Sequence, residues 1–219
     1  MNFIAATVEL RTKPIDSVRA YGLDYMCADA VVPGSGDNAE VRLRVLCYNR
    51  TGPKLETFGG WKEGTRALIT GNIVFGDDSG KPLDIIINTI ETNVPQDMYC
   101  NQVVLGNAFF GDNEIRERRN GTVACKIGTT LDNSSTTTWL YLETYEARKE
   151  KLTKYIRKGR PCCIQGYIRE YRKDDADSPY RAIVANDFTI RKDRERTGGR
   201  KTETGSASGY AEVDPTPDY

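Results

Sequence analysis

The sequence repeats itself once, with a period of roughly a hundred residues. Residues 64–73, GTRALITGNI, correspond to residues 159–168, GRPCCIQGYI, and Tyr48 corresponds to Tyr145. The units that stack into solenoids are only about 20–50 residues long, so this period is too long for one of them. The repeat therefore indicates a domain that has been duplicated within the chain of 219 residues.

The second copy carries the sequence signals of five strands and one helix. Along residues 137–145, Trp139 and Tyr141 alternate with Leu140 and Leu142, which is the period of a strand. Residues 147–157 lack Gly and Pro, and their apolar residues lie three to four apart, as on one face of a helix. We therefore expect a helix at residues 147–157 and strands at residues 102–110, 122–131, 137–145, 160–171 and 180–190.

The first copy has the same order of elements. Its strands are expected at residues 3–10, 24–32, 41–48, 66–75 and 83–92, with a short helix or turn at residues 53–58. Three strands, one helix and two strands are typical of the OB-fold, a five-stranded barrel. The sequence thus predicts an all-β protein of two tandem five-stranded OB-fold barrels, each with one helix between strands three and four.

The domain boundaries follow from the repeat and from a change in composition. We expect a diverged OB-fold domain over residues 1–96 and a second OB-fold domain over residues 97–192. Residues 193–219 have almost nothing to bury, and such a segment cannot offset the entropy lost on ordering. We therefore expect a disordered tail there, which ends on Asp214, Pro215, Pro217, Asp218 and Tyr219.

The net charge is zero, but it is unevenly spread along the chain. Residues 1–97 carry 10 Lys and Arg against 13 Asp and Glu, a net charge of −3. Residues 98–196 carry 19 against 14, or +5, and residues 197–219 carry 2 against 4, or −2. A basic second domain with an acidic tail indicates a polyanionic ligand and a separate contact made by the tail.

Composition argues against several classes of function. The chain has no histidine, so a Ser-His-Asp or Cys-His catalytic arrangement is impossible, and we expect no enzyme. Its six cysteines form no C-x-x-C pair, which favours free thiols inside strands over a metal site, and no cofactor is expected. There is neither a membrane-spanning apolar run nor a secretory signal, so we expect a cytoplasmic protein.

Aromatic residues of the second copy form a candidate surface for single-stranded nucleic acid. Such binding needs aromatic faces that stack on bases and cations that follow the phosphates. These rings could instead fill the barrel core, but Leu140, Leu142, Ile164 and Ile168 already supply an inward-facing set. The stacking residues expected here are Trp139, Tyr141, Tyr145, Tyr167 and Tyr171, and the phosphate contacts are Arg116, Arg157, Lys158, Arg160 and Arg169.

The first copy has fewer aromatic residues at the corresponding positions. Arg42 and Arg44 stand where the second copy has its tryptophan and first tyrosine, while Tyr48 keeps the place of a stacking tyrosine. Together with Arg66, these arginines predict binding to phosphates more by charge than by stacking. The alternative is a barrel that serves mainly for dimerisation or spacing.

The second copy resembles the bacterial and phage single-stranded-DNA-binding protein family. Residues 101–107, NQVVLGN, are similar to the opening strand of that family. Residues 111–116, GDNEIR, resemble its Asp-Pro-Glu-x-Arg segment, with an asparagine where the family has proline. Trp139 and Tyr145 fall where the family has a Trp and a Phe that stack on bases.

The resemblance implies an assembly and a partner for the tail. In this family four OB-folds surround the DNA, so a chain with two barrels implies a homodimer. Family tails end in acidic residues followed by Ile-Pro-Phe and recruit replication and repair proteins. The tail of this chain is similar because it is acidic and contains proline, but it ends on Tyr219, and Thr216 separates its two prolines.

Three functions remain open on the sequence. The leading one is sequence-independent binding and protection of single-stranded DNA in replication, recombination and repair, with the tail recruiting partners. The second is an OB-fold interaction subunit of a replication or primosome complex that binds mainly protein. The third is an enzyme that acts on nucleic acid, such as a nuclease, which the residues support least.

Overall fold

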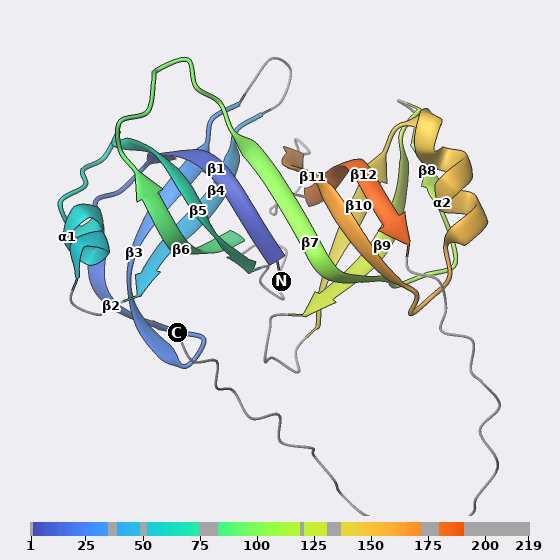
Figure 1. The fold of residues 1–219 in the computed structure, drawn as a ribbon, viewed down its shortest axis with the longest axis horizontal. Coiled ribbons are helices and arrows are strands. Elements are labelled where there is room, and N and C mark those ends of the chain that lie inside the picture. The colour runs from blue at the N-terminus through green and yellow to red at the C-terminus, as the bar shows by residue number, and fades with distance from the viewer. Residues whose placement is uncertain are drawn as a thin grey trace, which may run out of the picture.

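Two barrels lie beside one another in the computed structural model of the chain (Figure 1). The structure describes residues 2–34, 39–48, 52–74, 83–118, 121–130, 137–171 and 180–190. Within these ranges almost all regular structure is strand, with one short α-helix on each barrel. The expected all-β architecture with tandem OB-folds is confirmed.

The first barrel follows the predicted order, with one additional strand. Its elements are β1 (Asn2–Leu10), β2 (Ile15–Ala20), β3 (Leu23–Val32), β4 (Val41–Tyr48), α1 (Pro53–Gly59), β5 (Arg66–Val74) and β6 (Leu83–Glu91). Strands pair in the closed sequence β1-β3-β4-β6-β5-β1. All of these pairs are antiparallel except β4 with β6, which run parallel. Because the sheet closes on itself, the barrel has an inside, which is core, and an outside, which is available for function.

The second barrel repeats this topology. Its elements are β7 (Asn101–Phe110), β8 (Arg116–Glu117), β9 (Val123–Thr130), β10 (Thr137–Thr144), a 3₁₀ turn (Glu146–Arg148), α2 (Lys149–Tyr155), β11 (Pro161–Tyr171) and β12 (Tyr180–Ile190). The closed order is β7-β9-β10-β12-β11-β7, again with one parallel pair, β10 with β12. The predicted helix is shorter than expected, because its first turn is 3₁₀.

The core is filled by the inward-facing set of the alternating strands. Ile4, Val45 and Ile85 in the first barrel and Ile127 and Ile164 in the second are fully buried. Burying such a side chain contributes about 1.5–3 kcal/mol. The six cysteines are free thiols, as predicted, and four of them are buried.

Each barrel is covered at one end by its helix. In the first barrel Phe58 of α1 packs edge-on against Trp61, with ring centroids 5.2 Å apart. In the second barrel Leu152 of α2 is fully buried. Each helix therefore closes one end of its barrel with a buried side chain, and its other faces point away from the core.

The barrels are joined through their first strands. β1 pairs antiparallel with β7, from Asn2 opposite Leu105 to Ala6 opposite Asn101, about a centre at Ile4 and Val103. In the repeat Asn2 corresponds to Asn101 and Ala6 corresponds to Leu105, so the two end pairs of this ladder are equivalent to each other. The two barrels are therefore related by a pseudo-two-fold axis. The Asn2 amide also donates to Thr129 Oγ1 at 2.7 Å, which adds a side-chain contact to the junction.

A glycine occupies the same place in both copies because another strand passes too close for a side chain. A Cβ at Gly71 would lie 2.3 Å from the Ile86 carbonyl oxygen, and one at Gly166 would lie 2.1 Å from that of Val184. Both glycines stand at a register shift between adjacent strands. The glycine pair of the repeat thus marks a bulge that curves each barrel.

Replacing either bulge glycine should destabilise its barrel. Gly71→Ala and Gly166→Ala each force a strand displacement, and such overpacking costs about 1–3 kcal/mol. Gly60→Ala is a matched control, because its Cβ would lie 3.5 Å from the nearest atom. Urea unfolding should show a lower free energy of unfolding for the first two variants only. An unchanged unfolding midpoint for Gly166→Ala would contradict the close approach of the two strands.

Candidate nucleic-acid interface

The outer side of the second barrel presents the aromatic surface expected from the sequence. The outward-facing residues of β10 are Trp139, Tyr141, Glu143 and, just past the strand, Tyr145. The Trp139 ring is 47% exposed and the Tyr145 ring is 49% exposed. The alternative that these two rings fill the core is therefore excluded.

Two glycines, Gly111 and Gly128, lie directly against the Trp139 ring. A Cβ at Gly111 would be 2.7 Å from the indole, and one at Gly128 would be 2.9 Å from it, so any larger residue would displace the ring. Phe109 packs against the indole edge-on, with centroids 5.7 Å apart and planes at 80°. Lys126 Nζ lies 4.8 Å from the centroid of the Trp139 ring. We call Phe109, Lys126 and Trp139 the indole platform.

A network of charged and aromatic side chains lies beside the platform. The buried Glu143 carboxylate accepts a hydrogen bond from the Tyr171 hydroxyl and forms an ion pair with Arg118 at 2.7 Å. The guanidinium of Arg118 lies 5.4 Å from the centroid of the Tyr171 ring, and that of Arg169 lies 4.9 Å from it. Glu143 therefore fixes both a tyrosine and an arginine on the outer surface.

The remaining two predicted aromatics of β11 and β10 differ in exposure. Tyr167 is partly buried and hydrogen-bonds with exposed Tyr145. Tyr141 is also partly buried and lies opposite Lys126 on β9 and Ala182 on β12. All five predicted stacking residues of the second barrel are thus outside the core cluster and distributed along one sheet surface.

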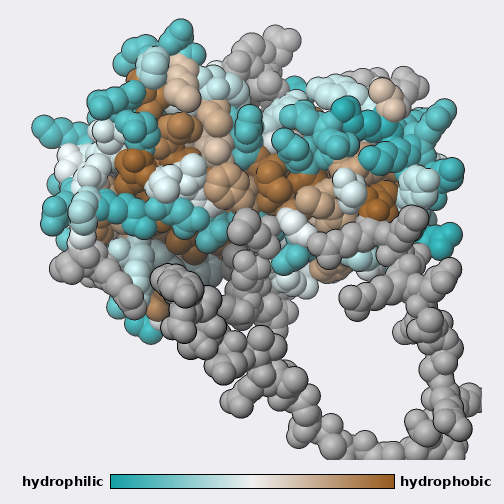
Figure 2. All heavy atoms as spheres, in the orientation of Figure 1, coloured by the Kyte–Doolittle hydropathy of each residue, from teal (hydrophilic) through white to brown (hydrophobic). Residues whose placement is uncertain are grey.

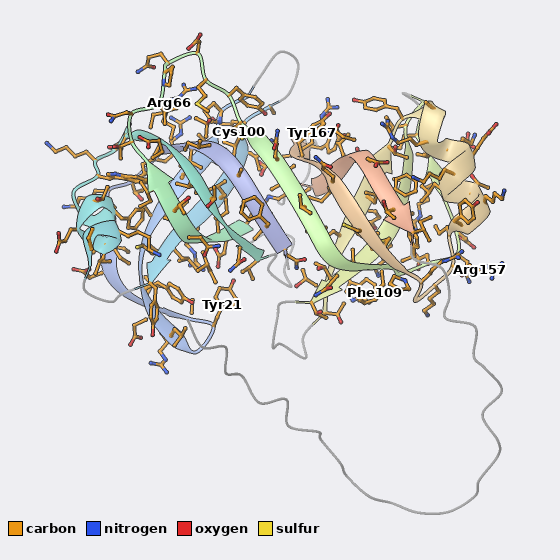
Figure 3. The ribbon with its side chains drawn as sticks, in the orientation of Figure 1. Tyr21, Arg66, Cys100, Phe109, Arg157 and Tyr167 are labelled. Atoms are coloured by element: carbon orange, nitrogen blue, oxygen red, sulfur yellow. The ribbon has the colours of Figure 1, made fainter. Side chains whose placement is uncertain are left out.

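The predicted cations of the second barrel fall into two groups. Arg169 lies among the aromatic residues, whereas Arg157 lies between the end of α2 and the start of β11 (Figure 3). Arg157 and Lys158 are exposed, and the guanidinium of Arg160 lies 5.7 Å from the centroid of the Tyr155 ring. Arg116 is exposed on β8. Hydrophilic side chains gather over the α2 region of this barrel, next to a band of hydrophobic ones (Figure 2).

The corresponding surface of the first barrel is covered. Tyr25, Cys27 and Leu46 point outward from β3 and β4 but are buried under Val18 and Ala20 of β2. Tyr48, predicted to stack on bases, belongs to this small cluster and packs edge-on against Tyr25 at 5.7 Å. Strand β2, which the sequence did not predict, is thus a cover over the face that is open in the second barrel.

Arg44, predicted to contact phosphate, is held by an internal ion pair. Its Nε and Nη2 donate to the two carboxylate oxygens of Asp84 at 2.9 and 2.7 Å. The Tyr21 hydroxyl donates to the same carboxylate at 2.7 Å. In the second barrel Tyr141 and Ala182 occupy the corresponding neighbouring positions. An ion pair in one copy is therefore replaced by a ring beside a small residue in the other.

Tyr21 reaches Asp84 because of the turn in which it lies. Tyr21 and Gly22 both have positive φ, of 51° and 79°, and connect Ala20 to Leu23 as a two-residue hairpin. This geometry matches the type I′ turn, whose twist suits paired strands. Of the other two predicted cations, Arg42 is exposed on β4, and the Arg66 guanidinium donates to the Met98 carbonyl.

Sequence reasoning missed three side chains of this surface. Lys126 is outward-facing on β9 by simple alternation and could have been found that way. Arg118 lies just after β8, a strand too short to predict. Phe109 was missed for a physical reason: strict alternation with Val103 would place it inside the barrel. A shift in the pairing of β7 with β11 near residues 105–108 turns it outward.

Other predictions concern the tail, metal binding and membrane spanning, and not all of them fall on the described residues. The tail residues Asp214, Pro215, Pro217, Asp218 and Tyr219 lie outside them. In the parts that the structure does describe, no three metal-binding side chains form a cluster. Among those same parts, no helix has the length and apolar character needed to cross a membrane.

Comparison with known proteins supports the fold. No protein-family model and no curated protein sequence matches the chain. The wild-type single-stranded DNA binding protein from Thermus aquaticus matches in structure with a TM-score of 0.60 and 17% identity, over 91% of this chain and 97% of that one. A deletion mutant of the Thermus protein matches with a TM-score of 0.61 and 16% identity, over 90% and 98%.

The chain has the fold of the Thermus aquaticus protein over both barrels. The match extends over nearly the full length of each structure, so it includes the tandem arrangement as well as the single barrel. At this level of identity the comparison establishes the architecture. The function has to be argued from the side chains on that architecture.

The tyrosines on these surfaces should titrate at unusually high pH. Burial and the hydrogen bond with Tyr145 raise the pKa of Tyr167 to about 12. Burial, then hydrogen bonds to Asp84 and to Glu143 respectively, raise the pKa of Tyr21 and Tyr171 above the ordinary value. Because the unfolded chain ionises at about pH 10, the stability from these hydroxyls is complete below pH 10 and is lost as pH rises further.

Absorbance at 295 nm measures this directly. In the native protein a fraction of the 12 tyrosines should ionise only well above pH 10, whereas in denaturant all should titrate together. Tyr171→Phe should remove part of the late-titrating fraction. A single native titration near pH 10 would contradict the hydrogen bonds described for Tyr21, Tyr167 and Tyr171.

Proposed function

We propose that this chain binds single-stranded DNA, independently of its sequence and without catalysing a reaction on it. The observation that carries the proposal is the indole platform. A large ring that is half exposed, supported from below by glycine and beside a lysine ammonium suits an unpaired base and its phosphate. A sequence-tolerant interaction is expected because every base has a π-face.

The platform is preorganised for stacking. Gly111 and Gly128 fix the height of the indole, and Phe109 fixes its tilt. Little side-chain entropy remains to be lost when a base stacks on it, so most of the stacking free energy of about 1–3 kcal/mol is available for binding. The structural neighbours from Thermus aquaticus are named as single-stranded DNA binding proteins, which supports this interpretation.

Cations beside the rings supply the phosphate contacts. Lys126 and Arg169 lie on the same outer surface as Trp139 and Tyr171, so a backbone that follows the stacked bases passes close to both. Arg116, Arg157, Lys158 and Arg160 extend the positive charge toward α2. Each neutralised phosphate releases condensed counterions, so the affinity should fall as salt is added.

The first barrel contributes differently. Arg44 is occupied by Asp84, and Tyr48 lies in the cluster under β2, so we assign both to the stability of the barrel. Arg42 and Arg66 are the cations that we retain for DNA. The Arg42 backbone amide donates to Glu170 of the second barrel at 3.3 Å, so Arg42 lies where the two barrels meet.

A wider role in replication, recombination and repair belongs to the same proposal. It includes a homodimer with four OB-folds and recruitment of partner proteins by residues 214–219. The alternative of a subunit that binds mainly protein is favoured by one observation, the covered outer face of the first barrel. The two functions are compatible if the first barrel serves assembly and the second binds DNA.

Loss of the indole should weaken binding strongly. Trp139→Ala removes the stacking ring, so affinity for oligothymidylate should fall by about 1–3 kcal/mol, or about 5- to 150-fold. Fluorescence anisotropy of a labelled oligonucleotide measures this. Trp61→Phe is the control, since Trp61 is 7% exposed and far from the platform, and it should bind as the wild type does. Equal affinities of Trp139→Ala and wild type would refute the site.

The salt dependence should identify Lys126 as a phosphate contact. Lys126→Ala should reduce the slope of log affinity against log salt concentration by about one, because one fewer phosphate is neutralised. Lys62→Ala, an exposed lysine of the first barrel, is the matched control and should leave the slope unchanged. If Lys126→Ala does not alter the slope, the Lys126 ammonium contacts only the Trp139 ring and not a phosphate.

A further inference from the structure

The segment that connects the barrels is fixed against the first barrel. The Thr7 amide donates to the Cys100 carbonyl at 2.9 Å, and the Cys100 amide donates to Thr7 Oγ1 at 3.1 Å. The Cys100 thiol donates to the Ala5 carbonyl at 3.3 Å, and the Arg66 guanidinium donates to the Met98 carbonyl. The residues just before β7 are therefore held by two strands of the first barrel, β1 and β5.

Between these anchors, Tyr99 reaches the second barrel. The Asn101 side-chain amide donates to the Tyr99 hydroxyl at 3.3 Å and to the Ile168 carbonyl at 2.9 Å. Asn101 Oδ1 in turn accepts from the Ile168 amide at 3.1 Å. Asn101 thus ties Tyr99 to the backbone of β11 directly beside Tyr167. Tyr99 nevertheless remains 40% exposed.

Three tyrosines come together at this point. Asn101 bridges the Tyr99 hydroxyl to Ile168, the residue that follows Tyr167, and Tyr167 hydrogen-bonds with Tyr145. We call Tyr99, Tyr145 and Tyr167 the junction tyrosines. In Figure 3 Tyr167 lies at the upper end of the second barrel, toward the first barrel, whereas Phe109 of the indole platform lies at its lower end. The two aromatic groups are therefore separate.

Cations flank the junction tyrosines on both barrels. Arg169 lies two residues from Tyr167 on the same face of β11, and the Arg66 guanidinium donates to the carbonyl of the residue before Tyr99. Exposed rings with arginines on either side are the pattern that holds a single strand, because rings stack on bases and cations follow the backbone. A strand that leaves the second barrel on this side meets these residues before it reaches Arg66.

We propose that the junction tyrosines are a second base-stacking site, which carries single-stranded DNA from the second barrel across the linker to the first. This inference rests on the proposed function. It assigns a ligand to Tyr99, a residue outside both barrels. The linker is hydrogen-bonded on both sides, so Tyr99 is already positioned before DNA arrives, and stacking on it orders little additional chain.

Oligonucleotide length distinguishes this site from the indole platform. One OB-fold covers about 4–16 nucleotides, so an oligothymidylate of about 8 nucleotides is held by one barrel, and one of about 35 must continue beyond it. Quenching of the exposed Trp139 reports the short oligonucleotide on the platform. Tyr99→Ala should leave that affinity within about twofold and lower the affinity for the long oligonucleotide by about fivefold or more.

Two variants control for structural effects. Tyr99→Phe keeps the ring and loses the contact with Asn101, so it should bind the long oligonucleotide nearly as the wild type does. Met98→Ala truncates an exposed neighbour whose described bond is made by its backbone carbonyl, and it should also be near wild type. Urea unfolding of Tyr99→Ala checks that the barrels keep their stability.

Several results would overturn the inference. If Tyr99→Ala and Met98→Ala bind the long oligonucleotide equally well, the junction tyrosines carry no base. If Tyr99→Ala weakens both lengths equally, Tyr99 belongs to the first site. Crosslinking with bromodeoxyuridine oligonucleotides should also label Tyr99 or Tyr167. Labels found only at other residues of the chain would overturn the inference. Failure of the wild type to bind either length would instead refute the proposed function itself.

Discussion

The antiparallel pairing of β1 with β7 determines how the two barrels lie relative to each other. It joins the first strand of one barrel to the first strand of the other about a centre at Ile4 and Val103, and thereby makes two small barrels one body. Every surface that spans the junction inherits its geometry from this pairing. Tyr99 is joined to β11 through Asn101, and Arg42 lies beside Glu170, because the first strands are held in this one register.

Duplication of a barrel has produced two outer faces with different chemistry. In one copy a strand covers the face and an arginine is neutralised by Asp84, so apolar side chains are buried there. In the other copy the covering strand is reduced to two residues, and the face carries exposed rings. The same topology thus carries a covered apolar face on one barrel and an exposed aromatic face on the other, since surface chemistry depends on side chains and not on the fold.

The strand order could be predicted because it depends on local alternation, on one helical segment and on the repeat, all visible in the sequence. The aromatic positions on β10 followed from the same alternation. Phe109 could not be predicted, because a shift of pairing between β7 and β11 turns it outward against its expected parity. Strand β2 and the Arg44–Asp84 pair were missed because they depend on contacts between segments far apart in the chain.

Hydroxyl-radical footprinting would show whether the two barrels bind DNA unequally, because it reports the solvent exposure of individual aromatic side chains in the intact protein. With a saturating long oligothymidylate, Trp139 and Tyr145 should be protected, while Tyr21, which is 46% exposed on the first barrel, should keep its reactivity. Protection of Tyr21 with Trp139 and Tyr145 unchanged would contradict the account.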